Sequence, residues 1–168
     1  MAEKLSKSAL RVQRALEAAG IAGRVVELPQ STRTANDAAA AIGCRVEQIA
    51  KSLVFRRLDS SQPVLVMACG TNRVDEQLIS SYLNAEIARA DADFVRSATG
   101  FAIGGVPPLG HDPPVQTFVD EDLLRLELIW AAAGTPHAVF SLTPAELVTL
   151  TGGRVVRVAT SPEASGRA

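Results

Sequence analysis

The segment "GFAIGGVPPLGHDPP", residues 100–114, constrains the fold of this chain more than any other stretch. It holds four glycines, four prolines and one histidine within fifteen residues. Proline lacks a backbone N–H and glycine destabilises regular elements, so this segment can form neither a helix nor a central strand. The helices and strands must therefore lie on either side of it, and the segment itself must be an irregular loop.

The remainder of the chain is strongly aliphatic. Hydrophobic residues make up 47% of the 168 residues and aromatic residues only 4%, so we expect a core of Ala, Val, Leu and Ile. This length suits one domain whose core needs no metal or disulfide. Seventeen basic and eighteen acidic residues give a net charge of −1. That balance argues against a surface coated in positive charge, although it permits a local basic face.

The spacing of apolar residues predicts short helices alternating with short strands in one mixed α/β domain over residues 1–168, without linker or repeat. The runs 52–58 and 63–70, joined by "DSSQ", are typical of a β-hairpin. The helices are expected over 6–19, 34–43, 46–50, 74–85, 92–99 and 143–152. The remaining strands are expected over 24–28, 115–124, 126–134, 137–142 and 154–160.

The sequence carries no sign of a metal centre or a membrane anchor. Cys44 and Cys69 have neither CxxC spacing nor a nearby histidine pair, so we interpret them as small buried hydrophobic residues and expect no metal and no cofactor. The N-terminus lacks an apolar signal core and no apolar run approaches a membrane span. We therefore expect a cytoplasmic protein without membrane contact.

The glycine-rich loop does not match the common phosphate-binding fingerprints. "GFAIGGVPPLG" is neither GxxxxGK[ST] nor GxGxxG followed by a helix. Gly104 and Gly105 permit positive φ and close approach of a ligand, while Pro107 and Pro108 stiffen the return of the chain. Two interpretations stay open: a tight structural turn, or a rigid backbone cradle for something flat or anionic.

Lys51 is the second notable feature, because it sits in the apolar context "QIAKSLVF". Its side chain can extend along the surface into water. Alternatively, its ammonium group is partly buried at the edge of a cleft and directed at a phosphate or a carbonyl.

Three segments, taken together, resemble the YbaK family. They are "AKSLVF", "VMACGTNRVDEQLI" and "RSATGFAIGGVPPLGH", in this order and at these separations, and the resemblance extends over about residues 20–158. Members are free-standing aminoacyl-tRNA deacylases related to the editing insertion domain of bacterial prolyl-tRNA synthetase. The resemblance implies a mixed, largely antiparallel, barrel-like sheet flanked by helices. It also implies trans-editing hydrolysis of mischarged aminoacyl-tRNA, of tRNA(Pro) type or carrying a small amino acid.

The resemblance also implies roles for particular residues. Lys51 matches the family's essential lysine, which would hold the terminal nucleotide and polarise the ester. Loop amides, Gly105 among them, would stabilise the oxyanion of a tetrahedral intermediate. In some members the substrate's 2′-hydroxyl and an ordered water are thought to complete the chemistry. The positions expected to bind substrate are Gly100, Gly104, Pro108, Gly110, Thr71, Asn72 and His137.

Specificity and partners are less constrained. The segment "AAAGTPH" replaces the "SGGKRG"-like segment of cysteinyl-specific members, so alanine, serine and threonine are as plausible as cysteine. His137 either contacts the substrate or is an ordinary strand-edge residue, and His111 either caps the loop or faces solvent. The expected partner is the acceptor end of a tRNA, and a synthetase is a candidate for delivering it. Phosphate contacts could come from Arg56, Arg57, Arg73, Arg89 and Arg96.

Two other functions stay open. One is a non-catalytic module of the same fold that binds tRNA ends or a nucleotide. The other is a small-molecule hydrolase that uses His137 with Asp120 or Glu121, which requires a buried histidine–carboxylate pair.

Overall fold

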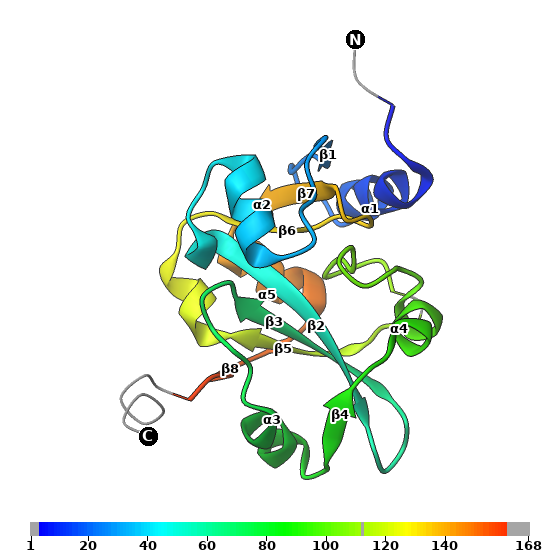
Figure 1. Cartoon of the computed structure of the whole chain (residues 1–168), viewed down its shortest axis with the longest axis vertical. Helices are drawn as coiled ribbons and strands as arrows, with labels where there is room; N and C mark the ends of the chain where they lie inside the picture. The colour runs from blue at the N-terminus through cyan, green and yellow to red at the C-terminus, as the bar shows by residue number, and fades with distance from the viewer. Residues whose placement is uncertain (1–3, 112, 161–168) are drawn as a thin grey trace.

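A computed structural model describes residues 4–111 and 113–160 of the chain, and its elements follow one another as Figure 1 shows. The helices in these ranges are α1 (Lys7–Ala18), α2 (Ala35–Ile42), α3 (Glu76–Leu83), α4 (Ala92–Thr99), α5 (Pro144–Thr151) and the short 3-10 helices η1 (Val46–Gln48) and η2 (Glu121–Arg125). The strands are β1 (Val26–Glu27), β2 (Ile49–Arg57), β3 (Pro63–Cys69), β4 (Ile87–Arg89), β5 (Gln116–Asp120), β6 (Ile129–Ala132), β7 (Ala138–Leu142) and β8 (Arg154–Val156).

All strands of the described ranges belong to one mixed sheet of eight strands, in the order β1-β7-β6-β2-β3-β5-β8 with β4 paired to β2. The β1–β7, β2–β3, β2–β4 and β6–β7 pairs are antiparallel, whereas β2–β6, β3–β5 and β5–β8 are parallel. The mixed α/β class and the predicted β2–β3 hairpin are thus confirmed.

Two of the elements predicted from the sequence differ in type or length from those in the structure. The helix expected over 46–50 is only the 3-10 turn η1, because Ile49 and Ala50 already pair with β6. The strand expected over 115–124 ends at Asp120, whose carboxylate accepts the Asp122 amide and starts η2. In both cases sheet pairing or a capping side chain overrides the local apolar pattern. The strands expected over 24–28, 126–134 and 154–160 are also shorter than predicted.

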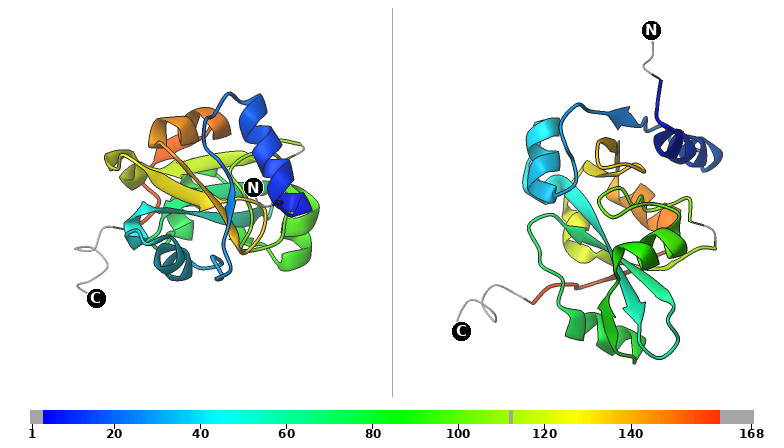
Figure 2. Two further views of the ribbon diagram at one scale, coloured as in Figure 1. Left: turned by 90° about the horizontal axis from the view of Figure 1, so that it is seen from above. Right: turned by 45° about the vertical axis from the view of Figure 1, so that its right-hand side comes forward.

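The helices cover both sides of the sheet. In Figures 1 and 2, α2 and α5 lie on opposite faces. Strand β2 runs between two apolar clusters: Ala50 packs into the cluster that contains α1, whereas Phe55 packs into the one that contains Ile79 of α3. Successive residues of β2 therefore face different surroundings, which places Lys51 and Ser52 on opposite sides of the strand.

Helix ends follow the signals in the sequence. Gly43, Gly100 and Gly152 cap α2, α4 and α5 in the left-handed conformation, which glycine adopts without steric cost. Thr143 caps the start of α5, with Pro144 in its first turn, as predicted. Within residues 4–111 and 113–160, no helix has both the length and the apolar character needed to cross a membrane.

Candidate active site

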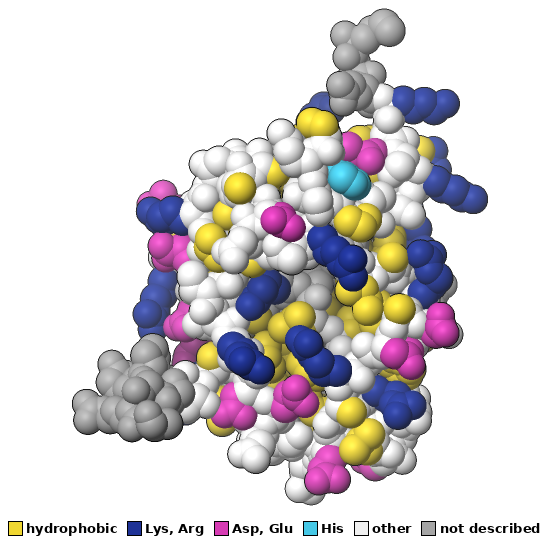
Figure 3. All heavy atoms as spheres, in the orientation of Figure 1, with side chains coloured by type: hydrophobic (Ala, Val, Ile, Leu, Met, Phe, Trp, Pro, Cys, Tyr) yellow, Lys and Arg dark blue, Asp and Glu magenta, His cyan; other side chains and the backbone are white. Residues whose placement is uncertain are grey.

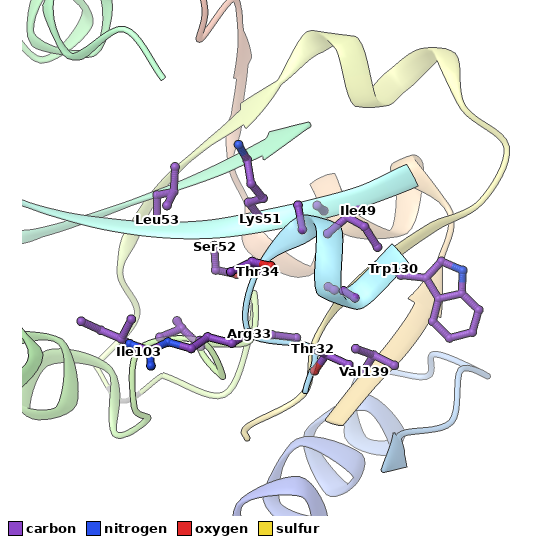
Figure 4. Close-up of a pocket in the computed structure, with 17 residues that line it drawn as sticks. Thr32, Arg33, Thr34, Ile49, Lys51, Ser52, Leu53, Ile103, Trp130 and Val139 are labelled. Atoms are coloured by element: carbon purple, nitrogen blue, oxygen red, sulfur yellow. The ribbon is translucent and has the colours of Figure 1, made fainter. Parts of the chain in front are cut away.

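A pocket of about 250 Å³ lies beside β2 (Figure 4). Its walls come from α2 and the turn before it, from β2, β6 and β7, and from the glycine-rich loop. The apolar part of the lining includes Ala38, Ile49, Val106, Trp130, Ala131 and Val139. We refer to this cavity as the β2 pocket; its walls suit a small apolar group.

Two further cavities adjoin the β2 pocket. One shares Ser52, Leu53 and Gly104 with it and extends to Arg89. The other shares Lys51 and Leu53 and lies on the α3 side of β2. The charged residues lining the three cavities, among those described, are Arg33, Lys51, Arg73 and Arg89 with one acid, Glu76. Figure 3 shows the result: Lys and Arg side chains surround a hollow with an apolar floor.

Lys51 lies at the junction of the β2 pocket and the cavity on the α3 side. In Figure 4 its side chain leaves β2 on the same side as Leu53, whereas Ser52 points the other way, toward Arg33 and Ile103. The ammonium group donates to the Asn72 carbonyl oxygen at 2.5 Å. Burial lowers the pKa of Lys51; the neighbouring Cys69 and Asp120 oppose this shift, and the charge of Arg89 adds to it. The ammonium has two further N–H donors for a ligand.

A buried carboxylate holds the segment that supports Lys51. Asp120 is 1% exposed and accepts hydrogen bonds from the Cys69 amide at 2.9 Å and from the Asn72 side chain at 2.8 Å. The Asn72 side chain also donates to Asp122 at 2.8 Å. Because two carboxylates hold the Asn72 side chain, the position of its backbone carbonyl, which accepts the hydrogen bond from Lys51, is fixed. Asp120 therefore acts as a positioning residue.

The two central glycines of the loop have different roles. Gly104 lines the β2 pocket with φ +89°, and no acceptor among the described residues bonds its amide. The Gly105 amide donates to the Ala102 carbonyl at 3.0 Å, and its carbonyl accepts from Gly134 at 2.8 Å. A Cβ at Gly105 would lie 2.8 Å from the Thr135 backbone. Gly105 is thus needed for close packing of the backbone and not for a positive φ, whereas Gly104 provides a backbone N–H that is free to donate to a ligand.

Helix α1 braces the same loop from outside the pocket. The Arg11 guanidinium donates to the Gly110 carbonyl at 2.8 Å and lies 4.5 Å from the centre of the Phe101 ring. It also fills the space where a Cβ of Gly100 would be, with Nη1 at 2.8 Å. One side chain therefore ties both ends of the loop to α1.

Comparison with known proteins identifies the family. The sequence profile of the aminoacyl-tRNA editing domain matches residues 29–150. The chain belongs to this family. The uncharacterised protein YwhH of Bacillus subtilis is 34% identical over 125 residues, which are 73% of this chain and 78% of YwhH. The family predicted from the sequence motifs is thus confirmed.

Two solved structures resemble the whole editing domain. That of a proposed trans-editing enzyme for prolyl-tRNA synthetase is 47% identical, with a TM-score of 0.88, and the match covers 94% of this chain and 100% of that one. A structure from work on grafting epitope backbones onto scaffold proteins is 44% identical, with a TM-score of 0.86 over 94% of this chain and 99% of that one.

The predicted site residues of the editing domain do not all meet at the pocket. Lys51 and Gly104 line the β2 pocket, and Asn72 contacts Lys51 through its carbonyl. The other predicted positions do not line the β2 pocket: Gly100, Gly105, Pro108, Gly110, Thr71 and His137. Pro108 is buried within the loop and Thr71 is exposed beside Cys69.

The histidines have structural partners. His137 is exposed, and its Nδ1 lies 2.9 Å from the Gln30 carbonyl oxygen, to which it donates. Asp120 has other partners, and among the described residues no hydrogen bond joins His137 to Asp120 or Glu121, so the pair that the small-molecule hydrolase would need does not form. His111 caps the loop, as one of its two interpretations predicted, because its Nε2 lies 2.7 Å from the Pro107 carbonyl oxygen.

Several lining residues were not foreseen from the sequence. Thr32 and Arg33 precede α2, and Trp130 lies on β6, yet all three line the β2 pocket. The Arg33 stem lies against Gly104, with Cγ 2.7 Å from the position of a Cβ there. Of the arginines proposed for phosphate contacts, Arg73 and Arg89 line a cavity. Arg56 lies near Phe94, Arg57 pairs with Asp59, and Arg96 is exposed in the last turn of α4.

The loop cap makes a prediction about pH. Burial lowers the pKa of His111 below its ordinary value of 6.5; the bond to Pro107 opposes the shift and Arg11 adds to it. Because the unfolded chain then binds this proton more readily, the free energy of unfolding should fall as the pH drops from 6.5 toward the lowered native pKa. Denaturant titrations between about pH 8 and about pH 5 measure this dependence.

The matched variant is His111→Gln, which can still donate to Pro107 but does not titrate in this range. It should show a flatter pH dependence than the wild type. An equal slope in both proteins would show that His111 is not the group responsible.

Proposed function

We propose that this editing domain hydrolyses the ester bond of mischarged aminoacyl-tRNA in trans, with small amino acids as substrates. The observation that carries the proposal is the apolar β2 pocket bordered on one side by the free amide of Gly104 and on another by Lys51. A small side chain would occupy the apolar walls. The ester would then lie where the glycine turn and the lysine meet.

The chemistry is a water-mediated ester hydrolysis. A water oxygen attacks the carbonyl carbon of the ester, the bond to the 3′-oxygen breaks, and that oxygen leaves with a proton. The products are the free amino acid and a tRNA with a free 3′-hydroxyl. The Gly104 amide can donate to the oxyanion, and the positive charges of Lys51 and Arg33 favour the charge that develops there.

The remaining cations suit the nucleic-acid part of the substrate. Arg73 and Arg89 line the cavities that adjoin Lys51. Arginine binds phosphate oxygens in a bidentate manner, so these two side chains would receive the backbone of the acceptor end. Few contacts of this kind give weak binding that falls steeply with salt. This accords with a chain whose net charge is only −1.

One observation favours a second function, a non-catalytic module that binds tRNA ends. The described lining of the β2 pocket contains no histidine, cysteine, aspartate or glutamate. Apart from Lys51, this lining would therefore contribute no general base, and hydrolysis would draw on a bound water and the substrate's hydroxyl. A binding module would retain the pocket and the cations and leave the ester intact.

A panel of mischarged tRNAs separates the two functions. Purified protein is incubated with tRNA(Pro) carrying alanyl, seryl, threonyl, cysteinyl or prolyl groups, and the ester that remains is measured over time. tRNA(Pro) comes first because one similar structure is that of a proposed trans-editing enzyme for prolyl-tRNA synthetase. We expect accelerated loss of at least one small non-prolyl group and slow loss of prolyl. Binding without acceleration of any ester would contradict the proposal and support the binding module.

A further inference from the structure

Thr32 is a buried polar residue in the wall of the β2 pocket whose hydroxyl has no partner. Only 6% of the residue is exposed, and no described residue forms a hydrogen bond with Oγ1. Buried polar groups in native proteins are almost always bonded, so an unpaired one calls for an explanation, and a bound ligand is one. The other hydroxyls of this wall are engaged: that of Thr34 accepts the Asp37 amide, and that of Ser52 contacts the Met67 sulfur.

The backbone around Thr32 is held firmly in place. Its amide donates to the Pro136 carbonyl at 2.6 Å, and the Leu28 amide donates to the His137 carbonyl at 2.8 Å. The His137 ring bonds the Gln30 carbonyl between these two contacts. Only rotation about χ1 is then left to Thr32. A threonine has few χ1 rotamers, so a change from one rotamer to another is the movement that would bring the hydroxyl to a ligand in the pocket.

We propose that Thr32 is a specificity-determining residue and that its hydroxyl bonds a hydroxyl on the aminoacyl side chain of the substrate. The inference rests on the proposed deacylase function and narrows its substrates to seryl or threonyl esters. A serine or threonine side chain gives Thr32 the missing partner, whereas alanine or valine leaves it unpaired. Ile49, Trp130 and Val139, which line the same pocket, supply the apolar surroundings in which one such bond discriminates strongly.

A double-mutant cycle tests this directly. The protein is compared as wild type and as Thr32→Val. The esters, all on the same tRNA, are compared in pairs that differ by the side-chain hydroxyl: seryl with alanyl, and threonyl with valyl. Threonine and valine have nearly the same shape, so the cycle isolates the contact between two hydroxyls. We expect Thr32→Val to lower the kcat/KM ratio of seryl to alanyl ester by about tenfold, as for loss of one neutral hydrogen bond. Thr32→Ser, which keeps the hydroxyl, should retain most of the ratio.

Stability gives a second readout. Since the hydroxyl has no partner in the free protein, Thr32→Val should melt at the same temperature as the wild type or higher. A lower melting temperature would mean that the hydroxyl already has a structural partner, and would overturn the inference. An unchanged seryl-to-alanyl ratio in a variant that still hydrolyses esters would overturn it as well, while leaving the deacylase function intact. Hydrolysis of none of these esters by the wild type would overturn both.

Discussion

Replacing Lys51 with alanine should lower kcat/KM for ester hydrolysis by at least about tenfold, as for loss of one charge-assisted contact, and leave the fold intact. The ammonium lies where the β2 pocket meets the cavity lined by Arg73 and Arg89, so it is placed to contact the terminal nucleotide beside the ester. Its removal weakens the binding of both the substrate and the transition state. The measurement is single-turnover deacylation of the best substrate from the tRNA panel.

Lys51→Met is the matched variant, since it removes the charge and keeps an unbranched apolar side chain. It should lose as much activity as Lys51→Ala. Burial disfavours the charged form of Lys51, so neither change should reduce the melting temperature appreciably. Deacylation at the wild-type rate by either variant, at a matched melting temperature, would remove Lys51 from the active site.

Gly105→Val should reduce both stability and deacylation, although Gly105 does not line the β2 pocket. A Cβ there would lie 2.8 Å from the Cα and N of Thr135, and this backbone cannot move aside cheaply. The loop must shift away, which breaks the bond from the Gly134 amide and displaces Gly104 next to it. Overpacking of this kind destabilises by about 1–3 kcal/mol. Thermal unfolding and deacylation rates measure the two effects.

Gly20→Ala is a control that separates the two effects. Gly20 has φ +75°, and a Cβ there would meet no atom within 4 Å, so alanine adds backbone strain without a clash. This variant should be less stable than the wild type and still deacylate normally below its melting temperature. Normal deacylation by folded Gly105→Val would show that the position of the loop does not matter for the reaction.

Local signals in the sequence predicted most of the elements. The hairpin, the helix caps at Gly43 and Gly100, and the Thr143–Pro144 start of α5 are set by residues only a few positions apart. The errors come from long-range pairing. Nothing near Ile49 indicates that it pairs with Trp130 on β6, about eighty residues away along the chain, and so the short helix expected over 46–50 gives way to a strand.

The candidate site could be predicted only where a motif marks it. Lys51 and Gly104 stand out by their sequence context, and both line the pocket. Thr32 and Arg33 reach it because the turn before α2 is tied to residues 136 and 137, a contact across a hundred residues that no local pattern reveals. Arg11 has no signal at all: it is one of several polar residues on an amphipathic helix.

His137 illustrates the same limit. Its position in "AAAGTPH" suggested a contact with the substrate, but the structure places its ring against the Gln30 carbonyl, on the segment that carries Thr32. The sequence context indicated a segment that contacts the turn before α2, but it left the direction of the side chain open. An effect of His137 on specificity, if measured, is expected to act through the placement of Thr32.

The most direct test of the account is a crystal structure with a hydrolysis-resistant substrate analogue. A 3′-seryl-amino adenosine, in which an amide replaces the ester, carries both the amino acid and the terminal nucleoside. We expect its serine side chain among Thr32, Ile49 and Val139, its carbonyl oxygen within hydrogen-bonding distance of the Gly104 amide, and its nucleoside beside Lys51. An analogue bound elsewhere on the surface, or with its amino acid outside the β2 pocket, would contradict the account.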